Sequence, residues 1–472
     1  MAMEETLLGF VECEGKSSPF VCENGLLQLF PTSEDEWKTN RQALIRKLGS
    51  EKNWSKEEWI GQSFIHGKLH DGTAIVFCVS NMSSNNNGFK SFSVSYVMKY
   101  NKRDLEPDKI HGIFVSGREV NYFYTSAKAF ETSFLEADNG VKKANVSTGM
   151  QQKCVIGNYN YKGCKITVTA DIVSKLAWKS DTPLTAYSKL NLSFSEAKNI
   201  EFVIEVYEHV LKFFYYVCGR TNIALDDIGI YGLVGEKETE AGVLKFIEVD
   251  CNEENDKKCS KQIINYELLG ECTKMILQEI ANEKLYFEHY CPSIEAKNSY
   301  GMDRIILNFT AFEREERNIY PTMQIRSNEY MEAKEKSLEV LEKLKTELTG
   351  KRKKYVKGFI ASISKSENKY ADRMKSALID CKDILKPFLM HDYNEYSEQH
   401  LDEMLEEISD RMNALRNNVV HGNLGMIIEA INISDFFTLE NLLYAMRLKK
   451  MGMNIISIQK SICKVRNYNI HI

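Results

Sequence analysis

An arginine, an asparagine and a histidine stand close together in one short segment and could act together on a phosphate group. Arg416, Asn417 and His421 belong to the run Arg-Asn-Asn-Val-Val-His, so the arginine and the histidine have the spacing Arg-x4-His. Arginine binds phosphate through a rigid fork of N–H donors, and histidine is the side chain best able to exchange protons near neutral pH. The segment therefore predicts phosphodiester chemistry that needs no metal ion.

A helix predicted over 397–420 must position these side chains. Five residues turn an unbroken helix by about 140°, so Arg416 and His421 would point apart. Gly422 follows directly and is predicted to end the helix, which would let His421 turn toward Arg416. Ser397 is the predicted N-cap. The helix has one apolar stripe, beside which Arg416 lies, formed by Leu401, Met404, Leu405, Ile408, Met412, Leu415 and Val419.

The same residues also have a purely structural interpretation. His421 would then cap the C-terminus of the helix without any chemistry. Arg416 would form an ion pair at the edge of its own helix, with Glu406, Glu407 or Asp410. The spacing alone leaves both interpretations open.

The composition is that of a folded globular protein. Of 472 residues 43% are hydrophobic and 27% are charged, and the length is sufficient for two to three domains. The acidic start and the lack of a long apolar run predict neither a signal peptide nor a membrane segment, so we expect a cytoplasmic protein. The twelve cysteines contain no Cys-x-x-Cys pair, and no Gly-rich phosphate loop is found. We therefore expect reduced thiols, no metal and no cofactor.

The net charge of −5 argues against a broad basic surface that would wrap nucleic acid, but two local clusters are basic. One lies at 351–354, and the other lies in the segment after Glu440, which contains no acidic residue. Either could follow a phosphate backbone, although a solvated helix face or loop is the alternative. The predicted RNA-binding residues are Lys351, Arg352, Lys353, Lys354, Arg447, Lys449 and Lys450.

The hydrophobic pattern changes near residue 265, which predicts an α+β protein with a β-rich N-terminal domain over 1–255 and an all-α domain over 264–472. A polar stretch at 252–261 is the predicted linker. An apolar helix over 195–218 should be buried against the sheet. The predicted strands lie in a hairpin at 63–79 around Asp71-Gly72, at 92–98, 113–115 and 120–124, in 154–170, and at 228–233 and 244–249.

Long helices are expected in the second domain, because Pro387 is the only proline after Pro321. The predicted helices span 264–283, 299–318, 327–349, 354–387, 397–420 and 434–466, with the third and fourth either joined or broken around Gly350.

The run from Arg416 to His421, late in an all-helical domain, resembles the Arg-x4-6-His signature of the HEPN superfamily (higher eukaryotes and prokaryotes nucleotide-binding). In that family the residue after the arginine is typically polar, as Asn417 is here. The order of the two domains is similar to that of the ApeA-type anti-phage defence proteins. The domain order extends the resemblance over most of the chain, and the hexad is its specific part.

The resemblance implies a metal-independent endoribonuclease. The RNA 2′-OH would attack the adjacent phosphorus while His421 moves the protons, Arg416 neutralises the developing charge, and Asn417 orients one of these groups. The products would be a 2′,3′-cyclic phosphate and a 5′-OH. It further implies a homodimer, or a higher homo-oligomer, in which two Arg/His pairs face one cleft, and cleavage of host RNA, with tRNA as one candidate, in abortive infection. A phage-derived trigger would act at the N-terminal domain.

Glu313 is a further residue that the resemblance implies, because several HEPN proteins hold an acid on the first core helix near the catalytic arginine. The phases of Met302, Ile306 and Phe309 place Glu313 on an apolar stripe, where a carboxylate needs a partner. A local pair with Arg317 is the alternative. For the whole protein, the alternative to a nuclease is a non-catalytic HEPN module that binds nucleotide, RNA or a partner protein.

Overall fold

The chain forms two compact units in the computed structural model: 1–211 with 222–255, and 212–221 with 256–472. Each unit is described by itself. The structure describes residues 6–13, 15–38, 58–84, 89–100, 109–136, 142–148, 153–176, 179, 181, 184–234, 237–247, 254–321, 328–364, 370–393, 398–420 and 430–472.

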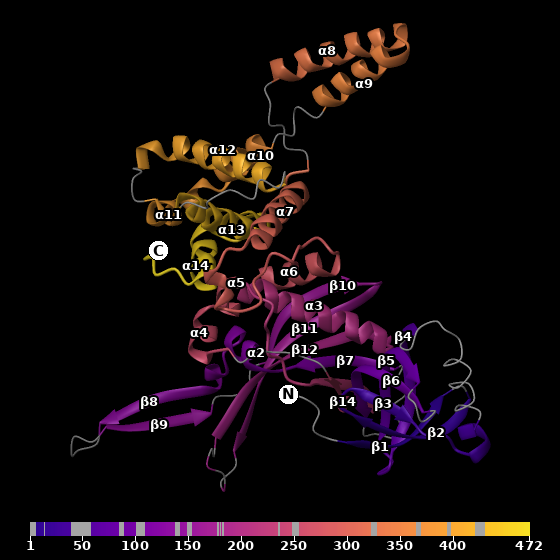
Figure 1. Ribbon diagram of the computed structural model, residues 1–472. Coiled ribbons are helices and arrows are strands. Elements are labelled where there is room, and N and C mark those ends of the chain that lie inside the picture. Colours follow the sequence, from indigo (N-terminus) through magenta and orange to yellow (C-terminus); the bar gives the residue numbers. More distant parts are fainter. Residues whose placement is uncertain are drawn as a thin grey trace. The chain divides into compact units, whose positions relative to one another are not determined.

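Within these residues the first unit is built on one antiparallel sheet, with the strand order β10-β11-β12-β7-β13-β14-β6-β3-β2-β1-β4-β5 (Figure 1). Strand β5 also pairs with β6, so the last six strands form a closed ring. A separate hairpin joins β8 (Phe130–Glu136) to β9 (Lys142–Thr148). The sheet strands are β1 (Leu7–Cys13), β2 (Lys16–Glu23), β3 (Leu26–Leu29), β4 (Glu58–Leu69), β5 (Ala74–Ser84), β6 (Lys90–Tyr100), β7 (Ile110–Val115), β10 (Cys154–Tyr161), β11 (Cys164–Leu176), β12 (Leu184–Lys198), β13 (Ile228–Val234) and β14 (Lys237–Phe246).

Alternating side chains of the ring strands fill its interior with apolar residues, among them Phe20 and Phe77, whose rings meet edge to face with centroids 5.0 Å apart. The predicted hairpin around Asp71-Gly72 is confirmed as β4 and β5, and Gly72 has a φ of +86°, a conformation that glycine adopts without strain. Strands are also confirmed at 92–98, 113–115, 154–170 and 228–233, whereas the strand predicted at 244–249 ends at Phe246.

The predicted strand at 120–124 is wrong, because this segment belongs to the short helix α2 (Arg118–Phe123). Val120 and Phe123 are both buried. Residues three apart lie on one face of a helix but on opposite faces of a strand, so burial of both residues on one side favours the helical turn.

The apolar helix is confirmed but begins later than predicted. Residues 195–198 complete β12, and helix α3 spans Ile200–Cys218. Asn199 caps it, since its side-chain oxygen accepts a hydrogen bond from the Phe202 amide at 3.1 Å. In the first unit, Phe202 packs on Phe194 of β12, and Tyr207 stacks on Phe246 of β14 at 4.7 Å.

The second unit is helical, so the predicted α+β class with a β-rich first part is confirmed. Its helices are α4 (Asp256–Lys261), α5 (Tyr266–Leu269), α6 (Cys272–Ala281), α7 (Met302–Ile319), α8 (Asn328–Glu347), α9 (Gly350–Ser364), α10 (Tyr370–Asp380), α11 (Lys382–Asp392), α12 (Leu401–Val420), α13 (Ala430–Lys450) and α14 (Ile455–Arg466). The linker predicted over 252–261 is wrong for residues 256–261, because these form helix α4. Cys259 holds the helix to the core and is 2% exposed.

Three of the long predicted helices are broken. Gly270, with a φ of +48°, separates α5 from α6, and Gly452, with a φ of +79°, follows α13. The helix predicted over 354–387 is divided into α9, α10 and α11, and Cys381 separates the last two. Pro387 does not end α11, because Gln459 of α14 donates to the Asp383 carbonyl at 3.0 Å, the acceptor that proline leaves without a helical partner.

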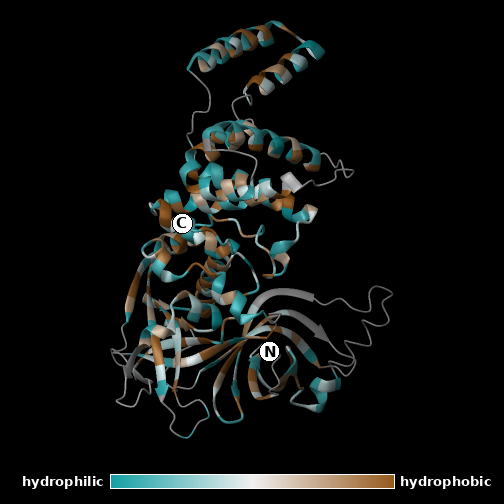
Figure 2. Ribbon diagram, turned by 90° about the vertical axis from the view of Figure 1, so that its left-hand side faces the viewer, coloured by the Kyte–Doolittle hydropathy of each residue, from teal (hydrophilic) through white to brown (hydrophobic). Residues whose placement is uncertain are grey.

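Helices α8 and α9 form a hairpin with little core of its own. No residue of α8 is buried, and only Val356 of α9 is buried. Figure 2 shows hydrophobic and hydrophilic residues mixed along both helices. In the described part of the chain, no helix is both long enough and apolar enough to span a membrane.

Candidate functional site

Arg416 lies in the last turns of α12 at the edge of the helical core. The predicted stripe is confirmed, because every member is at most 8% exposed: Leu401, Met404, Leu405, Ile408, Met412, Leu415 and Val419. Packing of this stripe fixes the rotation of the helix and leaves the Arg416 side chain 30% exposed. The arginine is therefore positioned by a rigid element and remains accessible.

Glu313 of α7 holds the Arg416 guanidinium. Its Oε1 accepts hydrogen bonds from Nη2 at 2.7 Å and from Nε at 3.0 Å. Its Oε2 lies 3.3 Å from Arg317, one turn further along α7. Glu313 therefore contacts both Arg416 and Arg317, the two partners predicted as alternatives. The pair with Arg416 joins residues 103 positions apart.

The ring of Tyr370, the first residue of α10, supports the same guanidinium. The Cζ atom of Arg416 lies 5.2 Å from the ring centroid, within the range of a cation–π contact. The ring is itself packed edge to face against Phe309 and Phe312 of α7. The Tyr370 hydroxyl is buried and has no hydrogen-bond partner among the described residues. Burial, followed by the charge of Glu313, raises the pKa of this hydroxyl well above its usual value.

Asn417 is exposed beside the arginine, and its Oδ1 accepts from Arg416 Nη1 at 3.4 Å. In the described part of the chain this is the one contact of Nη1, so this nitrogen has capacity for another acceptor. His421 and Gly422 lie outside the described residues, as does Ser397. The predicted swing of the histidine toward Arg416 stays a prediction.

Two expectations about these helices are corrected. The ion pair within α12 is wrong for Arg416, whose carboxylate partner is on α7, while Glu407 pairs with Arg411 at 3.6 Å. On α7 the apolar stripe has a different phase, because Ile306 is 44% exposed. The buried face includes Ile305 and Phe312 instead, so Glu313 lies at the edge of the stripe with a side chain 23% exposed.

Most of the predicted RNA-binding residues lie on the surface, but Arg447 does not. Its side chain is 2% exposed and pairs with Glu279 at 2.9 Å and with Glu315. A guanidinium buried between two carboxylates cannot bind a phosphate at the surface, so that expectation is wrong.

The remaining basic residues are exposed or partly exposed. Lys449 lies 2.7 Å from Asp380 Oδ1, and Lys450 donates to the Asn318 carbonyl at 2.7 Å. The first cluster occupies the first turns of α9, with Lys353 less exposed than Lys351, Arg352 and Lys354.

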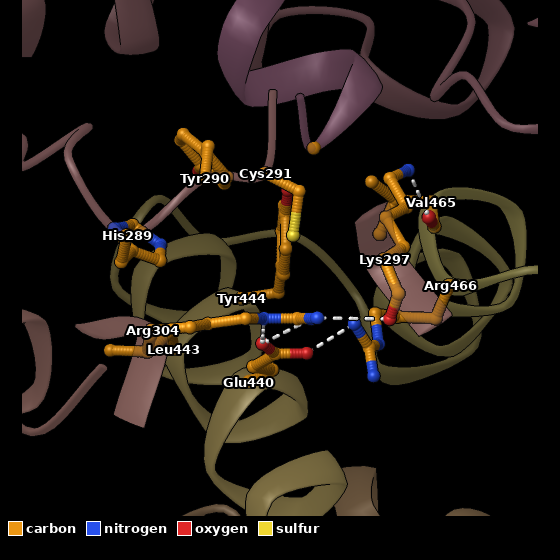
Figure 3. A pocket seen from close by; sticks show the side chains of 11 residues that line it. His289, Tyr290, Cys291, Lys297, Arg304, Glu440, Leu443, Tyr444, Val465 and Arg466 are labelled. Carbon is orange, nitrogen blue, oxygen red and sulfur yellow. Dashed lines mark hydrogen bonds and ion pairs between the residues drawn. The ribbon is translucent and has the colours of Figure 1, made fainter. Parts of the chain in front are cut away.

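A buried cluster of charges, not predicted from the sequence, lies elsewhere in the second unit (Figure 3). Glu440 of α13 accepts from Arg304 Nη2 at 2.7 Å and from Tyr300 at 3.1 Å, and it also pairs with Arg466. Burial alone would raise the pKa of Glu440, but the two arginines hold the pKa below its usual value. The available signal was Glu440 itself, the last acid of the chain, which stands between Leu439 and Leu442 in a segment rich in apolar residues.

Lys297 lies beside this cluster, and its ammonium group donates three hydrogen bonds within the protein. Its Nζ donates to the carbonyls of Cys218 and Val465 at 2.8 and 3.0 Å, and to Gln262 Oε1 at 3.2 Å. Burial, together with the positive charge of Arg466, lowers the pKa of Lys297 to about 7. The cavity that these residues line has a volume of about 20 Å³, which is room for a single water molecule.

The described residues contain no cluster of three or more histidine, cysteine, aspartate or glutamate side chains that could hold a metal ion. The contacts described above bring Arg416, Glu313, Tyr370 and Asn417 together in one candidate site. No family model, curated protein or solved structure matches this chain.

Proposed function

We propose that this protein is a metal-independent endoribonuclease of the HEPN type, with Arg416 and His421 as its catalytic pair. The observation that carries the proposal is the way Arg416 is held. A carboxylate from α7 fixes two of its nitrogens and an aromatic ring supports it, while Nη1 keeps donor capacity on a partly exposed side. This arrangement suits a group that must meet a phosphate in one orientation.

In the proposed reaction the RNA 2′-OH attacks the adjacent phosphorus and the bond to the 5′-oxygen of the next nucleotide breaks. His421 moves the proton between these oxygens, and Arg416 stabilises the charge that develops on the phosphoryl oxygens. Asn417 orients the phosphate or the arginine. A 2′,3′-cyclic phosphate and a 5′-OH result, and water is not consumed in this step.

Glu313 acts in this proposal as a positioning residue. It has no contact with the phosphate and serves to hold the arginine fork, while Arg317 balances part of its charge. The cellular role proposed with this activity is anti-phage defence by abortive infection in the cytoplasm, with host RNA, including tRNA, as substrate and a phage-derived trigger acting on the β-rich unit.

The test uses purified full-length protein incubated with total RNA in the presence of EDTA. We expect the wild type to cleave, and Arg416→Ala and His421→Ala to lose activity by about 100-fold or more, the usual scale for a group that stabilises the transition state. Arg317→Ala is the matched control, since it removes an exposed arginine that also contacts Glu313. Its cleavage should stay close to wild type.

Glu313→Gln separates positioning from stability. The pair is partly exposed, so its loss should cost about 1 kcal/mol or less of the free energy of unfolding. Cleavage should nevertheless fall by about tenfold or more, because the fork loses its fixed orientation. If Glu313→Gln and Arg416→Ala both cleave like wild type, this site is not the catalytic one. RNA that is cut only when a metal is supplied would contradict the chemistry.

A non-catalytic module is the second candidate function. The observation in its favour is that Nε and Nη2 of Arg416 are both engaged by Glu313, as in a structural ion pair between two helices. Intact RNA with every variant, together with a loss of stability in Arg416→Ala, would favour this function.

A further inference from the structure

A groove on the helical unit combines positive charge with aromatic rings. Its volume is about 800 Å³, within the range of small-molecule sites. It is formed by α4, by the segment before α7, and by parts of α13 and α14. Its cations are Lys257, Lys258, Lys261, Lys297 and Arg466, and its aromatic rings are Tyr300, Phe437 and Tyr468.

The charge of the groove is one-sided. Among the described residues that line it there is no carboxylate. Lys257 and Lys261 are exposed and lie four residues apart on α4, so they share one face of that helix. The exposed lysines of α4 therefore give this concave surface a potential that favours an anion with several negative charges.

The deep end of the groove is also short of negative charge. Lys297 and Arg466 line both the groove and the small inner cavity (Figure 3). The one carboxylate of that cavity, Glu440, is shared between Arg304 and Arg466. The Nε of Arg466 is buried without a hydrogen-bond partner among the described residues. One carboxylate serves two arginines here, so this end of the groove keeps a net positive charge.

The rings give the groove a second kind of contact. Phe437 is partly exposed, and its ring lies 5.7 Å from that of Tyr300. The guanidinium of Arg466 lies 5.3 Å from the Phe437 centroid, so charge and ring are adjacent. A flat heterocycle can stack on such a surface while its phosphates lie on the lysines.

We propose that this groove binds a nucleotide, with the phosphates on Lys257 and Lys261 of α4 and the base against Phe437. A bare phosphate would leave the rings unused, and an uncharged nucleoside would leave the lysines unused. The same chemistry is found at the end of an RNA chain, and the experiment separates this source from a free nucleotide.

The groove is separate from the Arg416 site, and the proposal does not rest on nuclease activity. Among the described residues, none that lines the groove forms a hydrogen bond, an ion pair or a ring contact with Arg416 or Glu313. Arg304, which belongs to the Glu440 cluster, precedes Glu313 by nine residues on α7, or roughly 14 Å along the helix axis.

The test is isothermal titration calorimetry of the full-length protein with ATP, AMP, adenosine and inorganic pyrophosphate, and with a short single-stranded RNA. We expect ATP and AMP to bind, pyrophosphate to bind more weakly and adenosine not to bind. The double variant Lys257→Ala/Lys261→Ala should lose about tenfold or more in ATP affinity, because two charged contacts are removed. Phe437→Leu should weaken ATP but leave pyrophosphate unchanged.

Lys336→Ala/Lys343→Ala is the matched control, since it removes two exposed lysines of α8 and the same net charge. Its ATP affinity should equal that of the wild type. Failure of ATP to bind, or equal ATP affinity in the α4 double variant and the wild type, would overturn the proposal. Binding of RNA alone, lost in the same variant, would overturn it in favour of an RNA end. Arg416→Ala should lose RNA cleavage but keep wild-type ATP affinity, because the two sites are independent.

Discussion

Arginines in the helical unit occupy two kinds of environment. Arg304 and Arg447 are at most 9% exposed and are surrounded by carboxylates and carbonyls, which makes them part of the core. Among the described residues Arg416 has one carboxylate partner and a supporting ring, and its side chain is 30% exposed. Its position is fixed but part of its donor set remains open, which is the combination that phosphate recognition requires.

Lys297 gives a prediction about stability at the scale of one residue. Its pKa is about 7 in the folded protein, against a value of 10.5 for an unperturbed lysine. Between these values the unfolded chain binds a proton that the folded protein does not bind, so the free energy of unfolding should rise with pH by up to about 1.4 kcal/mol per unit. As the pH falls toward 7, the unfolded chain keeps a proton that the buried lysine lacks, and the folded protein becomes less stable.

Urea unfolding of the wild type and Lys297→Met between pH 7 and pH 9 checks this expectation. The groups near Lys297 include Arg466, Arg220, Cys218 and Cys291. Burial raises the pKa of Cys291, which opposes the trend, so the difference between the two proteins is the quantity to compare. Parallel pH profiles would show that Lys297 keeps an ordinary pKa.

At the scale of elements, glycines determine where the helices end. Gly452 has a φ of +79°, and Gly358 lies inside α9 without a positive φ. A Cβ atom added at either glycine would meet nothing within 4 Å. The two positions therefore differ in backbone conformation and not in available space.

Gly452→Ala should lower the free energy of unfolding by about 1 kcal/mol, because alanine is strained at a positive φ. Gly358→Ala should raise the stability of α9 by about 0.5–1 kcal/mol, because glycine costs more conformational entropy in a helix. Urea unfolding measures the first change, and amide hydrogen exchange of α9 measures the second. The two substitutions should change stability in opposite directions. A stabilising effect of Gly452→Ala would contradict the positive φ of this residue.

At the scale of the whole molecule, one chain supplies one Arg416. The proposed nuclease needs two such sites facing one cleft, so we expect the active species to be a homodimer. Analytical ultracentrifugation at micromolar concentration should give twice the 54.3 kDa mass of one chain. A monomer that cleaves RNA at full rate would disprove the shared site, although Arg416 could still act alone.

The period of each segment, and from it the fold class, could be predicted from the amino-acid sequence. Alternation predicted the β4–β5 hairpin and β structure over 154–170, and the apolar stripe of α12 fixed Arg416 at the edge of a core. These features depend on neighbours in sequence, and local periodicity records them. The same reasoning could not say whether 120–124 is strand or helix, because that depends on which surface buries Val120 and Phe123.

Which charged side chains meet depends on how the helices pack. Glu313 reaches Arg416 across 103 residues, and Glu440 of α13 lies between Arg304 and Arg466. Arg447 looked like a surface cation in the sequence, yet it is buried between Glu279 and Glu315. An ion pair has no periodicity, and its partners are chosen by the packing of whole helices. The Arg-x4-His spacing and the place of Glu313 near the arginine were therefore predicted from the sequence, whereas the Tyr370 ring that supports the arginine was not.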